Sequence, residues 1–234
     1  MYWITRLAVL MLALTMLSSC NRTLGCPDGA IEWVDLLMIS NVKYQHHFPE
    51  PADEEIHLQI EKGRPLGEIK FKMADKACSD HKMKNGDAAY VEEGTTIYAV
   101  KGYPASLMVL ANDKVYIAEE NKSAKTLGDL YPINDHVKNI HIESTGDGRR
   151  IHTFSPGVKE LFLNEWMKLK IEDYNVLQQK NAFEGEPTFL EIELNNGVSF
   201  RHLYWPNSNA FGQNALGNKT LQDLMMHELA SAGE

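Results

Sequence analysis

The chain has 234 residues, and its 32 acidic and 23 basic side chains give a formal net charge of −9 with histidine neutral. A chain this acidic repels nucleic acid and anionic lipid head groups, so neither is an expected partner. The length is enough for one large domain or for two small domains with adequate cores.

The first twenty residues have the pattern of an export signal. A single positive charge at Arg6 precedes an apolar run from Leu7 to Leu17, which is shorter than the roughly 20 residues that a membrane-spanning helix needs. The run ends in Leu17-Ser18-Ser19-Cys20, and this stretch resembles the lipobox of bacterial lipoproteins. The resemblance implies cleavage before Cys20 and acylation of its sulfur and its new amino group, with palmitate-type chains as the membrane anchor.

We therefore predict a signal peptide over residues 1–19 and a lipidated tether over residues 20–30. The mature domain is expected on the outer face of the cell membrane, held there by lipid on Cys20. Loss of Arg6 with the signal changes its formal charge to −10. The alternative is a plain secretory signal or an N-terminal helical anchor, with Cys20 present by chance.

The two remaining cysteines are candidates for a disulfide. If Cys20 carries lipid, Cys26 and Cys78 form the one available pair in an oxidising compartment, and we predict a bridge between them. The sequence leaves open that both are free thiols. His81 follows Cys78 at a spacing found in zinc sites, but a lone Cys-x-x-His is a weak signal, and we predict no metal or cofactor site.

Strand patterns dominate the chain up to residue 132. Apolar residues that alternate with polar ones predict strands with one buried face, while the polar, proline-containing stretch 46–55 is expected to be a loop. Asn112-Asp113 separates two apolar segments, and because both residue types tolerate a left-handed backbone, the pair predicts a hairpin turn. The expected strands cover residues 33–44, 66–73, 95–100, 107–110 and 115–117.

Helix and hairpin signals are mixed in the second half of the chain. Ser155-Pro156 has the residue order of a helix start, and apolar residues at helical spacing follow it as far as Leu169. Asn195-Asn196-Gly197 is the strongest hairpin signal and separates two predicted strands, 188–194 and 198–205. Together these elements predict an α+β fold, in which a mostly antiparallel sheet packs against two or more helices.

The two halves are expected to form an N-terminal β-rich unit over residues 31–132 and a C-terminal α+β unit over residues 133–234. The sequence KTLGDL at 125–130 recurs as KTLQDL at 219–224, and each copy follows an expected hairpin, so two related units are conceivable. In the second copy Thr220 with Asp223 is expected to cap a closing helix. Convergence is the alternative, because this residue pair is a common way to begin a helix.

The search for catalytic motifs gives no catalytic residue. Nucleophile, phosphate-binding and calcium-binding motifs of the required spacing are missing from the sequence. Nine histidines are present, but His46 and His47 are adjacent in an expected loop and are interpreted as solvent-exposed rather than as metal ligands. Glu191 and Glu193 alternate with apolar residues and are expected on the solvent-facing side of their strand.

Aromatic residues at the end of the second hairpin are the better candidates for a binding surface. Tyr204 and Trp205 end the strand, and Phe211 follows in a polar loop of small residues. Such a segment can present a stacking platform for a sugar or a peptide. The alternative is that Trp205 packs on the core and the loop only returns the chain to the last helix.

Residues 26–35, 78–88 and 98–103 carry a further likeness. These stretches resemble a family of uncharacterised lipoproteins from Gram-positive, spore-forming bacilli, which implies a position on the outer face of the cell membrane and supplies no catalytic residues. We expect a binding or regulatory role at the cell envelope, with a protein, peptide or glycan ligand. An envelope hydrolase or other enzyme with an unrecognised site is the first alternative, and a structural component of the envelope or spore surface is the second.

Overall fold

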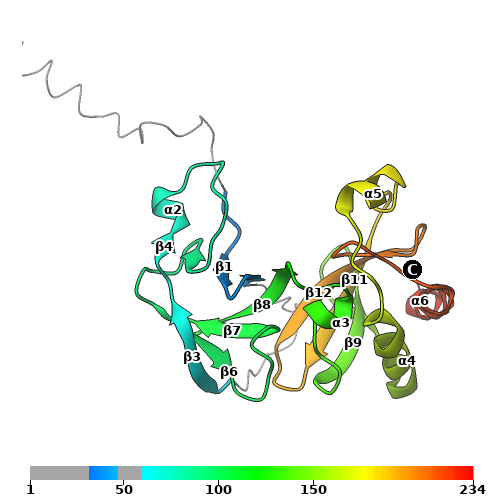
Figure 1. Ribbon diagram of the computed structural model, residues 1–234. Helices are drawn as coiled ribbons and strands as arrows, with labels where there is room; N and C mark the ends of the chain where they lie inside the picture. Colours follow the sequence, from blue (N-terminus) through cyan, green and yellow to red (C-terminus); the bar gives the residue numbers. More distant parts are fainter. Residues whose placement is uncertain (1–31, 47–59, 234) are drawn as a thin grey trace, which may run out of the picture. The chain divides into compact units, whose positions relative to one another are not determined.

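The computed structural model describes residues 32–46 and 60–233 (Figure 1). Every described strand lies in one compact unit, which covers the described residues of 33–76 and 83–233, and residues 32 and 77–82 do not belong to it. The predictions for the signal peptide, for Cys20 and for Cys26 therefore fall outside the described residues.

The N-terminal strands form one eight-stranded sheet in the order β3-β6-β7-β8-β2-β1-β5-β4. Neighbouring strands are antiparallel, except that β4 and β5 are parallel. The strands are β1 (Leu36–Ile39), β2 (Val42–Gln45), β3 (Lys62–Glu68), β4 (Phe71–Lys72), β5 (Asp87–Ala88), β6 (Thr96–Val100), β7 (Met108–Ala111) and β8 (Lys114–Asn121).

The turns between the strands of this sheet confirm one predicted hairpin and divide two segments that were each predicted as a single strand. Asn112 and Asp113 both have a positive φ, 49° and 58°, so the predicted hairpin between β7 and β8 is confirmed. The single strand predicted over residues 33–44 is wrong, because Ser40 and Asn41 adopt the same left-handed conformation and divide the segment into the hairpin β1–β2. The strand predicted over residues 66–73 is also divided: β3 ends at Glu68 and β4 is followed at once by a short helix.

The C-terminal strands form a six-stranded antiparallel sheet in the order β10-β9-β11-β12-β13-β14. The hairpin around Asn195-Asn196-Gly197 joins β11 and β12 as predicted, with Glu193 opposite Ser199 at its end. The strands are β9 (Val137–Glu143), β10 (Arg150–Thr153), β11 (Thr188–Leu194), β12 (Ser199–Trp205), β13 (Ala210–Phe211) and β14 (Ala215–Leu216).

Five helices are described: α2 (Met73–Lys76), α3 (Leu127–Leu130), α4 (Pro156–Trp166), α5 (Tyr174–Gln179) and α6 (Lys219–Ala232). The start of α4 at Ser155-Pro156 is as predicted, and α4 and α6 lie side by side next to the six-stranded sheet (Figure 1). The architecture is therefore the predicted α+β fold with mostly antiparallel sheet. None of the helices in the described ranges is long and apolar enough to cross a membrane.

The predicted cap of the last helix is wrong. Asn218, not Thr220, precedes α6, and its side-chain oxygen accepts a hydrogen bond of 2.9 Å from the backbone N–H of Leu221. Thr220 lies inside the first turn of the helix. In the first copy of the repeated sequence, by contrast, Thr126 does cap α3 and forms a capping box with Asp129.

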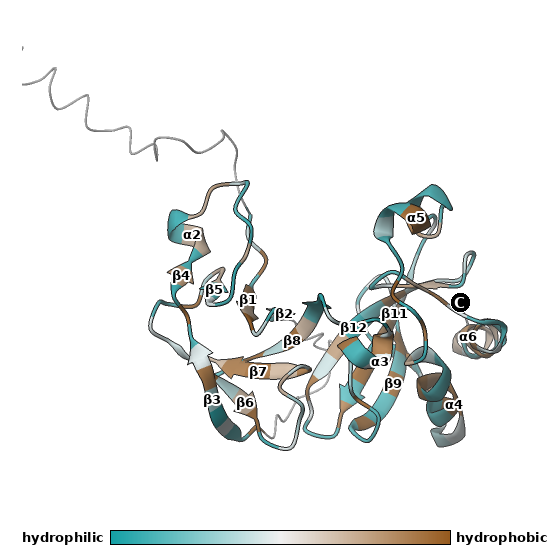
Figure 2. Cartoon of the chain, viewed as in Figure 1, coloured by the Kyte–Doolittle hydropathy of each residue, from teal (hydrophilic) through white to brown (hydrophobic). Residues whose placement is uncertain are grey.

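The six-stranded sheet has one apolar and one polar face. Hydrophobic and hydrophilic residues alternate along β9 (Figure 2), and β11 and β12 follow the same period. The side chains of the apolar face pack toward α4: Phe162 of this helix contacts Phe211, with ring centroids 6.0 Å apart, and Trp166 contacts His202 at 4.9 Å. A single buried core joins this face to the eight-stranded sheet.

Candidate binding cleft

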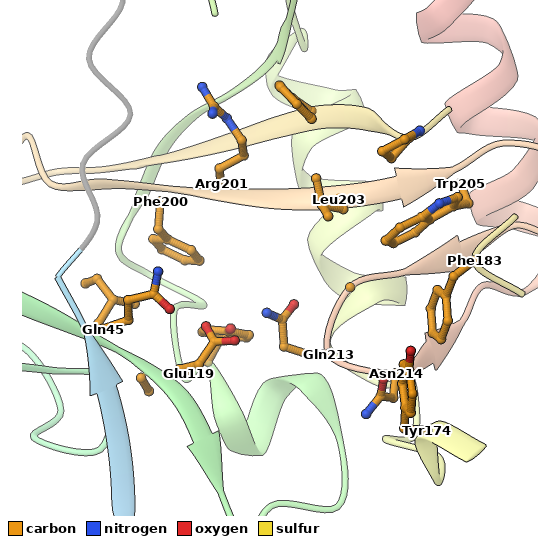
Figure 3. Close-up of a pocket in the computed structure, with 16 residues that line it drawn as sticks. Gln45, Glu119, Tyr174, Phe183, Phe200, Arg201, Leu203, Trp205, Gln213 and Asn214 are labelled. Atoms are coloured by element: carbon orange, nitrogen blue, oxygen red, sulfur yellow. The ribbon is translucent and has the colours of Figure 1, made fainter. Parts of the chain in front are cut away.

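A cleft of about 670 Å³ lies beside β12, and residues of both sheets line it. Its volume is in the range of sites that hold small ligands. Figure 3 shows the side chains that line it: the rings of Tyr174, Phe183 and Trp205 lie at one end, together with Asn214, and Gln45, Glu119 and Phe200 lie toward the other, with Gln213 between them. The cleft therefore combines an apolar wall with a few polar groups.

The aromatic end is built from three rings that come from different segments. Tyr174 begins α5 and is 50% exposed, and its ring stacks on that of Phe183 with centroids 5.8 Å apart and an interplanar angle of 11°. Phe183 in turn meets the indole of Trp205 edge-on at 5.0 Å. Asp173 fixes the start of α5, because its side chain accepts hydrogen bonds from the backbone N–H groups of Asn175 and Val176.

Alternation along β12 separates Trp205 from its neighbour Tyr204. Arg201, Leu203 and Trp205 line the cleft from one face of the strand and Phe200 lines it from the other, whereas Tyr204 is fully buried in the core. Phe211 is also fully buried, with its ring 4.7 Å from that of Tyr204. The prediction of a surface made by Tyr204, Trp205 and Phe211 is thus wrong for the two residues that face the core, and only Trp205 lies in the cleft.

The polar end is formed by Glu119 of β8 and Gln213 of the β13–β14 turn. Burial raises the pKa of Glu119, and the neighbouring charge of Glu120 raises it further, while Lys43 and a hydrogen bond from Gln213 act in the opposite direction. The Oε1 atom of Gln213 is buried and has no hydrogen-bond partner within the described residues. The acceptor that this end of the cleft offers to a ligand is therefore the half-buried carboxyl group of Glu119.

Among the described residues that line the cleft, Arg201 is the cationic side chain, and its charge is compensated by a carboxylate. Its Nε atom donates to Glu143 Oε2 at 2.6 Å, and its guanidinium lies 4.6 Å from the ring centroid of Phe189. Burial raises the pKa of Glu143, whereas the Arg201 guanidinium lowers it. The pair fixes Arg201 along the polar face of the sheet.

Further ion pairs cross the same polar face. Arg150 makes two hydrogen bonds to Glu191, of 2.6 and 3.0 Å, and Glu193 accepts from Lys138 at 2.7 Å and interacts with His141 at 3.2 Å. These hydrogen bonds lower the pKa of Glu193 to about 2 although burial opposes the change.

The expectation that these two glutamates face solvent is wrong: Glu191 is 0% and Glu193 7% exposed. Partners on adjacent strands hold them, which permits burial of charged groups. In the part of the chain that the structure describes, no group of three or more histidine, cysteine, aspartate or glutamate side chains is placed to hold a metal ion.

The structure describes one of the two cysteines of the predicted disulfide. Cys78 is disulfide-bonded, and its partner lies outside the described residues, so the pairing with Cys26 stays a prediction. His46 is half-buried rather than solvent-exposed, because it packs against Tyr116 with ring centroids 5.5 Å apart. His47 lies outside the described residues.

Of the residues that line the cleft, sequence reasoning identified Trp205, and the residues it missed include Glu119, Tyr174, Phe183 and Gln213. No local pattern identifies them, because they belong to four segments that only the tertiary fold brings together. Comparison with known proteins finds no family whose sequence pattern the chain matches, no curated protein of similar sequence and no matching solved structure.

Proposed function

We propose that this chain is an extracytoplasmic binding protein, tethered to the outer face of the cell membrane by lipid on Cys20, which binds an envelope ligand in the cleft beside β12. The aromatic wall of Tyr174, Phe183 and Trp205 is the observation that carries this proposal. Partly exposed aromatic rings beside fixed polar groups suit a ligand with an apolar face and a polar edge.

One observation favours binding over hydrolysis, and a second observation favours an extracytoplasmic location. Among the described residues that line the cleft, Glu119 is the one carboxyl group, whereas glycoside cleavage generally uses a pair of carboxyl groups across the scissile bond. Cys78 is disulfide-bonded, as is typical of proteins that fold in an oxidising compartment. The signal-like segment that ends at Cys20 supplies the proposed route to that compartment.

The tether is tested by metabolic labelling with palmitate. The wild-type chain is expected to incorporate label and to fractionate with membranes, and Cys20→Ala is expected to do neither. A wild-type protein that carries no label, or that keeps its original amino terminus, would contradict the tether without affecting the cleft.

The binding role is tested by calorimetric titration with muropeptides, the soluble fragments released from cell walls by lysozyme. We expect saturable binding to the wild-type domain and a loss of at least ten-fold in affinity for Trp205→Ala. Tyr90→Ala is the matched control, because Tyr90 is 47% exposed and does not line the cleft. No binding to the wild type, or equal binding to Trp205→Ala, would overturn the proposal.

A further inference from the structure

The polar end of the cleft presents one carboxyl group to a ligand. The half-buried Glu119 lines the cleft and accepts a hydrogen bond from the carboxamide of Gln213, whose own Oε1 atom is buried. Figure 3 shows Gln213 between Glu119 on one side and the rings of Phe183 and Trp205 on the other. A ligand that reaches this end of the cleft therefore meets the carboxyl group of Glu119.

The nearby cations are occupied by other carboxylates. Lys43 pairs with Glu120 at 2.8 Å, and Arg201 pairs with Glu143 at 2.6 Å. Glu119 itself has no ion pair among the described residues. A partly buried carboxylate without a cation is unfavourable, and a cationic group brought by a ligand would compensate it.

The backbone at Gln213 is held in a conformation that its side chain does not favour. Gln213 and Asn214 have φ values of 56° and 61°, and such a turn usually contains asparagine or glycine at both positions. The turn is fixed from outside, because the carbonyl of Asn214 accepts a hydrogen bond of 2.8 Å from the backbone N–H of Glu172. The fold thus keeps a glutamine at a strained position, from which its carboxamide faces Glu119.

We infer that the cleft selects ligands that carry a primary ammonium group, which donates hydrogen bonds to the carboxylate of Glu119 while the rest of the ligand packs against Trp205 and its neighbouring rings. An ammonium group has three donors and no acceptor and carries a positive charge, so it matches a carboxylate that has no ion-pair partner among the described residues. This inference rests on the proposed function, since it names the chemistry of the same ligand.

The test compares two forms of one ligand mixture. Muropeptides with free amino groups are titrated into the wild-type domain beside the same muropeptides treated with acetic anhydride, which removes the positive charge and keeps the sugars and peptides. We expect acetylation to weaken binding at least ten-fold. Glu119→Gln is expected to weaken binding of the free amines by a similar factor and to abolish the preference over the acetylated form.

Glu120→Gln is the matched control, because Glu120 is the exposed neighbour on the same strand and does not line the cleft. It should retain both the affinity and the preference. Equal affinity of the wild type for free and acetylated muropeptides overturns the ammonium inference and leaves the binding role intact. Absence of binding by either form overturns both. The comparison with wild-type protein needs no variant, so it decides the question even if Glu119→Gln does not fold.

Discussion

The imidazole of His202 meets the indole of Trp166 nearly edge-on, with ring centroids 4.9 Å apart and an interplanar angle of 75°. Neither ring nitrogen of His202 has a hydrogen-bond partner within the described residues, and the indole nitrogen of Trp166 has none either. Gln213 lies near enough to favour the charged imidazole slightly, but no hydrogen bond of normal geometry joins them, and burial dominates. A neutral histidine thus occupies an aromatic core position.

This arrangement predicts acid sensitivity. Burial lowers the pKa of His202 to about 4, so between pH 6.5 and 4 the unfolded chain binds a proton that the folded chain does not. The contribution of His202 to the free energy of unfolding should therefore fall by about 3 kcal/mol as the pH decreases through this window. Chemical unfolding followed at several pH values measures the decrease.

His202→Phe is expected to remove this decrease and to raise stability at pH 7 by about 1 kcal/mol, since two unsatisfied buried atoms are lost. His227→Phe is the control, because His227 is exposed on α6 and its replacement should leave the wild-type pH profile unchanged. If His202→Phe loses as much stability between pH 6.5 and 4 as the wild type, another group is responsible.

The raised pKa of Glu119 predicts a pH dependence of stability that is opposite to that of His202. Because burial raises its pKa in the folded state, the ionised carboxyl destabilises the fold above that pKa and has no effect below the unfolded value near 4.5. Glu119→Gln should therefore unfold at higher denaturant concentration than the wild type at pH 7, and at an equal concentration at pH 4. The control variant Glu120→Gln, measured by the same denaturant unfolding at pH 7 and at pH 4, should show no such difference from the wild type. A Glu119→Gln protein that is less stable at pH 7 would contradict this account.

Local signals in the sequence identified the features that neighbouring residues determine. Asn112-Asp113 and Asn195-Asn196-Gly197 specify tight turns by their own backbone preferences, and Ser155-Pro156 specifies a helix start. The same kind of signal at Ser40-Asn41 was concealed by the apolar residues on either side. Because serine is seldom left-handed, the turn there was not expected.

The cleft depends on contacts that no local pattern encodes. Glu119 and Gln213 lie on different sheets, and β13 and β14 have two residues each, which is too short for any periodicity to be recognised. The burial of Glu191 likewise follows from Arg150 on another strand, so the alternation that placed it on the polar face said nothing about its exposure. Sequence reasoning thus located Trp205 and missed the groups around it.

The Arg150–Glu191 pair predicts strong coupling in a double-mutant cycle. Arg150→Met leaves the fully buried Glu191 without its bidentate partner and should lower the free energy of unfolding by about 3–5 kcal/mol. Glu191→Met should have a smaller effect, because the Arg150 side chain retains 17% exposure. The double variant should be closer to the wild type than Arg150→Met is, since neither charge is then left unpaired. Additive losses in the cycle, measured by urea unfolding, would show that the pair is not coupled.

The start of α6 gives a prediction that separates the observed cap from the one expected by sequence. Asn218 accepts the hydrogen bond from Leu221 N–H, and its own side-chain amide donates to Glu165 Oε2 at 2.8 Å. Asn218→Ala should therefore lower the free energy of unfolding by about 1–2 kcal/mol, as is usual for the loss of an N-cap. Thr220→Ala should change it by less than about 0.5 kcal/mol, because Thr220 is an exposed residue within the first turn. Thermal unfolding of both variants measures the difference, and a larger loss for Thr220→Ala would restore the cap at Thr220 and contradict the observed helix start.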